Sequence, residues 1–136
     1  MTVGLWAKPH SMLKSLLGDI QVLERSQICD LMVSDGVLPD VWRPCECKIA
    51  VIPGDASPDL RYVRAGRVVT YGLSPRNTVT VSSMTDKYLM LAIQNEILNL
   101  DRRRVECQEF FAPRPRAVPP DTAIAAATAL LVLGFE

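Results

Sequence analysis

Four aspartates are the strongest candidates for chemistry in this chain. Asp30, Asp35, Asp55 and Asp59 each lie at or beyond a predicted β-strand. In open α/β sheets, ligands bind outside the carboxyl ends of the strands, and carboxylates placed there can hold a divalent cation or a ribose. The structural alternative is the commoner one, because aspartate also caps helices and forms turns in such loops.

The sequence does not contain the residue patterns of several other common active sites. The sequence has no G-x-x-x-x-G-K-[ST] or G-x-G-x-x-G phosphate loop and no G-x-S-x-G elbow. His10 is the only histidine, so a Cys–His nucleophile has little support. Cys45 and Cys47 lack the second ligand pair of a structural zinc site. We therefore expect no catalytic residue, no cofactor and no metal site. The alternative is a small divalent-cation-dependent enzyme that uses the aspartates.

Length and composition indicate one domain over residues 1–136. Fifteen basic and fifteen acidic residues cancel, so no net field favours nucleic acid or an anionic membrane, and we expect neither as a partner. The basic run Arg102–Arg104 is expected at a solvated loop tip. The chain opens without a charged-then-apolar signal segment. A cytoplasmic location with four reduced cysteines is therefore expected.

Two predicted strands organise the chain, Arg67–Tyr71 and Thr78–Ser83, and both are rich in β-branched residues. Gly72, Ser74, Pro75 and Asn77 supply a turn between them. The runs Ile28–Val33 and Lys48–Ile52 are apolar without alternation, which is typical of strands covered on both faces. We expect these four strands in one sheet, with the first three in the chain mutually parallel.

The segments around these strands are predicted as covering layers. Apolar residues recur at helical spacing over Ser11–Arg25, and the short apolar segment before it, up to Ala7, could add or cover an edge strand. Ala56–Leu60 could form one helical turn, capped by Ser57 or Asp55.

The C-terminal half of the chain predicts a hairpin and a buried helix. The hairpin has strands at residues 88–98 and 105–112, and a helix over Lys87–Leu100 is the competing interpretation. Pro113–Pro120 is expected to be an extended linker. Asp121 is expected to cap a helix over Thr122–Leu133, which Gly134 ends. That helix is apolar on nearly every side, so it should be buried, and it is too short to cross a bilayer.

A recognisable order of motifs runs through residues 48–84, KIAVIPGDASPDLRYVRAGRVVTYGLSPRNTVTVSSM. It resembles the second half of the central domain of Mur ligases, the ATP-dependent amino-acid ligases of peptidoglycan synthesis. In that family a strand ends in an Asn-x-Asp-Asp-type turn. A short helix, a strand that closes in Thr-[Tyr/Phe]-Gly and a further strand then follow. Asp55 falls at the acidic turn and Thr70-Tyr71-Gly72 at the strand end. We therefore add Tyr71 to the candidate ligand-binding residues.

The resemblance extends to both sides but lacks the family's nucleotide-binding residues. Upstream, ICDLMVSDG is similar to a family strand, and downstream TAIAAATALLVLG is similar to the Asn-Ala-Leu-Ala-Ala helix that ends in Leu-Gly. The Gly-Lys-Thr loop is absent, Pro119-Pro120 stand where the family has His-Asn, and Thr122 occupies the place of the helix asparagine. The resemblance therefore implies a fold and a link to the cell envelope, and it argues against ligase activity.

Together these observations predict an α/β fold, a mostly parallel sheet flanked by helices with an added β-hairpin. The expected function is a non-catalytic binding, regulatory or assembly module, and a degenerate copy without activity is a further hypothesis. We expect a homo-oligomer or another protein partner, bound through a sheet edge or through the hairpin residues Tyr88, Met90, Phe110 and Phe111. In the monomeric alternative, the helix Ser11–Arg25 covers the bare face.

Overall fold

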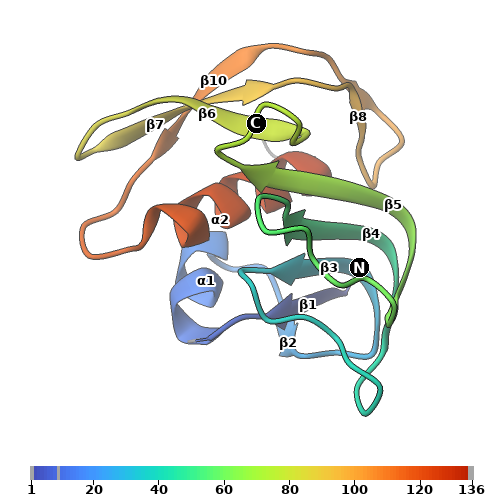
Figure 1. The fold of residues 1–136 in the computed structure, drawn as a ribbon. Coiled ribbons are helices and arrows are strands. Elements are labelled where there is room, and N and C mark those ends of the chain that lie inside the picture. The colour runs from blue at the N-terminus through green and yellow to red at the C-terminus, as the bar shows by residue number, and fades with distance from the viewer. Residues whose placement is uncertain (1, 9, 135–136) are drawn as a thin grey trace.

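An eight-stranded sheet forms the centre of the computed structural model, which describes residues 2–8 and 10–134 (Figure 1). The strands follow the spatial order β10-β7-β6-β5-β4-β3-β1-β2. Their bounds are β1 (Val3–Trp6), β2 (Val22–Glu24), β3 (Ile28–Ser34), β4 (Cys45–Pro53), β5 (Val63–Gly72), β6 (Val79–Met84), β7 (Tyr88–Ile93) and β10 (Glu109–Pro113). Two short strands, β8 (Ile97–Leu98) and β9 (Arg104–Val105), pair separately.

Across the sheet from β2 to β6, each strand is parallel to the next. The prediction of four strands in one sheet is confirmed, as is the parallel arrangement of β3, β4 and β5. In β4 the run Ile49–Ile52 is wholly buried, as its unalternating apolar sequence indicated. The predicted edge position of the N-terminal segment is wrong, because β1 lies inside the sheet between β3 and β2.

The antiparallel part of the sheet consists of β6, β7 and β10. The predicted hairpin is confirmed, and the alternative helix over Lys87–Leu100 is not formed. Each arm is interrupted, so that β7 pairs with β10 while β8 pairs with β9 closer to the tip. Arg102 and Arg103 lie in the connection at that tip, as expected.

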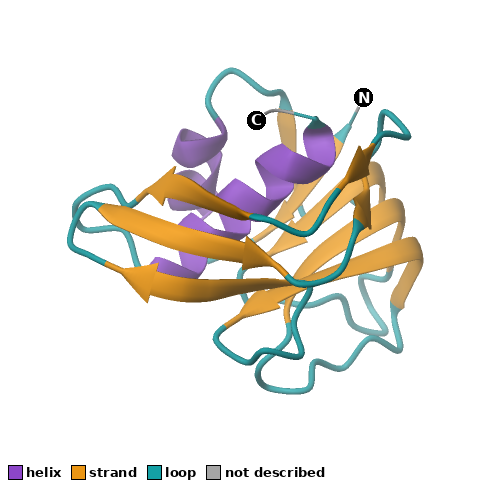
Figure 2. Cartoon of the chain, turned by 90° about the horizontal axis from the view of Figure 1, so that it is seen from above, coloured by secondary structure: helices purple, strands orange, loops and turns teal. Residues whose placement is uncertain are grey.

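Both helices lie on the same face of the sheet (Figure 2). These are α1 (His10–Leu17) and α2 (Pro120–Leu133), which pack against each other and against the strands. Leu13, Ile124 and Val132 are fully buried in the core that they share with the sheet. No helix among residues 2–8 and 10–134 is long and apolar enough to cross a membrane.

The two helices differ from prediction at their ends. The prediction of a helix to Arg25 is wrong, because Gly18 adopts a left-handed φ of 71° after Leu17 and the chain turns to form β2. Asp121 does not cap α2; Pro119 takes the N-cap position without a side-chain hydrogen bond. Gly134 ends α2 as predicted, with a φ of 96° and its N–H directed at the carbonyls of the last turn.

Loops, not helices, cover the other face of the sheet. A second apolar cluster there includes Trp6, Met32 and Ile52, and Leu38 and Leu60 pack on it from the loops after β3 and β4. The predicted helical turn over Ala56–Leu60 is wrong, because the segment forms an irregular loop that supplies this cover.

Candidate functional site

The structure separates the four candidate aspartates. Asp35 follows β3 and Asp55 follows β4, so both lie at the carboxyl edge of the sheet. Asp30 lies within β3, where its carboxylate accepts a hydrogen bond from the Thr2 N–H at 2.7 Å and meets the Lys48 ammonium at 3.2 Å. These contacts, the Thr2 bond first, hold the pKa of Asp30 below its usual value.

Asp59 is engaged in an exposed loop. Its carboxylate pairs with the Arg61 guanidinium at 2.8 Å and also accepts the Arg61 backbone N–H. The side-chain bond to Arg61 is the main reason that the pKa of Asp59 is lowered. Asp59 therefore shapes its own loop and does not join the other aspartates.

Asp55 organises the turn between β5 and β6. Its carboxylate accepts the backbone N–H groups of Leu73 (2.8 Å) and Ser74 (2.9 Å) and the side-chain amide of Asn77 (2.7 Å). Burial alone raises the pKa of Asp55, but these hydrogen bonds outweigh burial and hold the pKa below its ordinary value. The observed role is therefore that of a turn former.

Asp35 and Tyr71 lie near each other, but their side chains make different contacts. The Tyr71 side chain is buried, and its hydroxyl donates to the Ser34 carbonyl at 2.6 Å. Burial, followed by the charges of Asp35 and Asp121, raises the Tyr71 pKa. Burial also raises the pKa of Asp35, and the backbone N–H groups of Lys8 and Val37 oppose that rise without cancelling it. Among residues 2–8 and 10–134, no three His, Cys, Asp or Glu side chains are grouped to hold a metal ion.

Three cysteines gather on the loop-covered face. The sulfurs of Cys29 and Cys45 are 4.0 Å apart, and Cys47 pairs with Cys29 across the strands. The bond from Cys29 lowers the pKa of Cys45, but Cys47 and burial outweigh it and raise that pKa to about 12. The bond to Cys45 and burial raise the pKa of Cys29 as well. Cys29 and Cys45 are therefore protonated at neutral pH and are poor nucleophiles.

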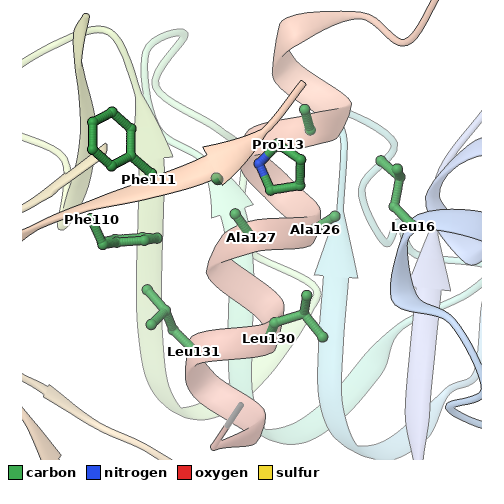
Figure 3. Close-up of a pocket in the computed structure, with 10 residues that line it drawn as sticks. Leu16, Phe110, Phe111, Pro113, Ala126, Ala127, Leu130 and Leu131 are labelled. Carbon is green, nitrogen blue, oxygen red and sulfur yellow. The ribbon is translucent and has the colours of Figure 1, made fainter. Parts of the chain in front are cut away.

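An apolar groove is the most distinctive concave surface that the described residues form. It lies over the outer side of α2, between β10 and α1 (Figure 3). Its volume is about 210 Å³, and every side chain that lines it is apolar. The lining comes from Leu16, Phe110, Phe111, Ala112, Pro113, Ala123, Ala126, Ala127, Leu130 and Leu131.

The floor of the groove explains why α2 lacks a polar side. After Asp121 the helix has no charged residue, and Ala127 and Leu130 remain partly exposed in the groove. A helix that is apolar all round is normally buried on every side. An all-apolar helix sequence therefore indicates a further contact on the outer side of α2 as well as burial in the core.

The strand beside the groove is a free sheet edge. Within the part of the chain that the structure describes, β10 pairs with β7 on one side only. The Ile93 N–H donates to the Gln108 carbonyl, and the Arg114 N–H donates to the Lys87 carbonyl, each at 2.8 Å. Because antiparallel residues alternate in the direction of their backbone groups, Glu109, Phe111 and Pro113 direct theirs to the open edge. Phe111 is 71% exposed on this strand and packs edge-to-face on Tyr88.

Comparison with known proteins gives no further identification: no family model, no curated protein and no solved structure matches the chain.

Proposed function

We propose that this chain is a non-catalytic binding and assembly module that uses the groove over α2 and the free edge of β10 to hold another polypeptide. The groove and the edge lie side by side, and this juxtaposition carries the proposal. An unpaired edge offers backbone hydrogen bonds, and an adjacent apolar groove offers pockets for alternate side chains of an added strand.

The exposed apolar side chains supply the driving force. Phe111 and Tyr88 are 71% and 55% exposed and pack against each other. Phe111 borders the groove, but its ring projects from the side of β10 that faces away from α2 (Figure 3). Full burial of one such side chain stabilises a complex by about 1.5–3 kcal/mol. A strand added to β10 would therefore gain apolar contact on both faces of the sheet.

The candidate catalytic groups support binding over catalysis. Asp30, Asp55 and Asp59 are committed to hydrogen bonds that build the local fold. Cys29 and Cys45 of the thiol cluster are protonated.

The likeness to the second half of a Mur ligase central domain is part of this proposal. The parallel strands β3, β4 and β5 and the final apolar helix support this likeness, whereas residues 56–60 form a loop where the family has a short helix. The likeness implies a link to cell-envelope synthesis. All four cysteines are free thiols, which fits a reducing compartment.

Site-specific photo-crosslinking tests the proposed function. A photoreactive residue replaces Ala127 in the groove, and a control chain carries it at Leu23 on β2, which is 45% exposed at the opposite sheet edge. In cells that naturally make the protein, the Ala127 position should give covalent adducts of discrete mass, and the Leu23 position should not. Equal adducts at both positions, or none at Ala127, would contradict the proposal.

A further inference from the structure

We infer that the polypeptide held at this edge is a second copy of the chain, paired antiparallel with the first through β10 about a twofold axis. This inference rests on the proposed function, and it specifies the partner. It follows from two properties of residues 106–116, namely their charge order and the direction of their backbone groups.

The charge order along this segment is self-complementary. Glu106 and Glu109 precede the apolar run Phe110–Pro113, and Arg114 and Arg116 follow it. Antiparallel pairing sets the acidic end of each copy against the basic end of the other, whereas parallel pairing would set like charges together. Both glutamates are exposed, and within residues 2–8 and 10–134 they form no ion pair. Their charges are therefore free to meet a partner.

The backbone groups of β10 match the same arrangement. Glu109, Phe111 and Pro113 direct their backbone groups to the open edge and are symmetric about Phe111. With the twofold axis at Phe111, the two Phe111 residues exchange N–H and C=O bonds. The Glu109 N–H of each copy then meets the Pro113 carbonyl of the other. Pro113 has no N–H, so this register leaves only the Glu109 carbonyl without a partner from the opposite strand.

The side chains are compatible with this register. Phe110 and Ala112 stand on the groove side of β10, since Ala112 is buried and Phe110 lines the groove. In the paired strands Phe110 of one copy lies opposite Ala112 of the other, so a large side chain meets a small one. The two Phe111 side chains face each other on the outer side, and aromatic pairs of this kind stabilise antiparallel strands.

Two variants test the arrangement, each of which reverses the charges at one end of residues 106–116. One chain carries E106R and E109R, and the other carries R114E and R116E. Each should fold, because Glu106, Glu109 and Arg116 are exposed. Arg114 is partly buried, and within the described residues it is the one of the four with a side-chain hydrogen bond, donating to the Thr85 carbonyl at 3.2 Å. Circular dichroism checks the fold of each variant.

Sedimentation of purified full chains gives the decisive result. We expect wild type to reach twice its 15.0 kDa monomer mass with rising concentration. Each variant alone should associate at least about tenfold more weakly, because every end-to-end ion pair becomes a repulsion. An equimolar mixture of the two variants should recover association, since opposite charges then meet at both ends.

Several outcomes overturn the inference. These are a wild type that stays monomeric at all concentrations, variants that associate as wild type does, and a mixture that does not recover. If wild type is monomeric but Ala127 still crosslinks to a different polypeptide, the second copy is rejected and the binding module stands. If Ala127 gives no adduct, the proposed function itself fails.

Discussion

Replacing Asp55 with alanine should destabilise the fold by about 2 kcal/mol. The substitution removes three hydrogen-bond acceptor contacts, to the N–H groups of Leu73 and Ser74 and to the Asn77 amide. A hydrogen bond contributes about 1 kcal/mol net, and more when one partner is charged. Asp55 is exposed, however, so water replaces part of what is lost. At about 4 °C per kcal/mol for a chain of this size, the melting temperature should fall by roughly 8 °C.

The pH dependence of this loss identifies its cause. The folded-state pKa of Asp55 is depressed, so its stabilisation is fully present above the unfolded value of about 3.9 and is lost as pH falls through the folded value. Urea unfolding at neutral pH should separate D55A from wild type, and the difference should shrink at acid pH. Asp59→Ala is the matched control, because Asp59 contacts only Arg61 in an exposed loop. Unfolding of D55A at the wild-type urea midpoint would refute the role assigned to Asp55.

Three further outcomes are expected. Under native conditions a thiol reagent should label exposed Cys107 quickly and the three buried cysteines only after unfolding; two or more fast thiols would contradict the burial of that cluster. Tyr71→Phe should cost about 1 kcal/mol in urea unfolding, because it deletes the 2.6 Å bond to the Ser34 carbonyl, and an unchanged midpoint would argue against that bond. ATP with Mg²⁺ should not raise the melting temperature, since the sequence has no phosphate loop; a concentration-dependent rise would revive the enzyme hypothesis.

The parallel strands could be predicted from local sequence because a strand that is buried on both faces needs an apolar residue at nearly every position. The run Ile49–Ile52 is one example, with no polar residue to break it. The α1 boundary could not be predicted so well. Apolar spacing continues past Leu17 to Leu23, but Gly18 turns the chain, and Leu23 belongs to a strand. Local periodicity cannot distinguish these two uses of the same residues.

The candidate site was harder to predict because its parts meet only in the folded chain. The groove joins Leu16 of α1 to Phe110 of β10 and Leu130 of α2, which are far apart in sequence. Of the four aspartates, Asp35 and Asp55 lie at the carboxyl edge of the sheet, whereas Asp30 lies within β3. The sequence predicts Tyr88, Met90, Phe110 and Phe111 as a contact surface on the hairpin, and of these Tyr88 and Phe111 are largely exposed.

Amide hydrogen exchange along β10, measured residue by residue against protein concentration, tests the central claim most directly. The Phe110 and Ala112 N–H groups point to β7 and should be protected at every concentration. The Glu109 and Phe111 N–H groups face the open edge, so they should exchange quickly in dilute solution and become protected as association proceeds. Fast exchange of the Phe111 amide at concentrations where the chain is fully associated would contradict the claim that β10 is the binding edge.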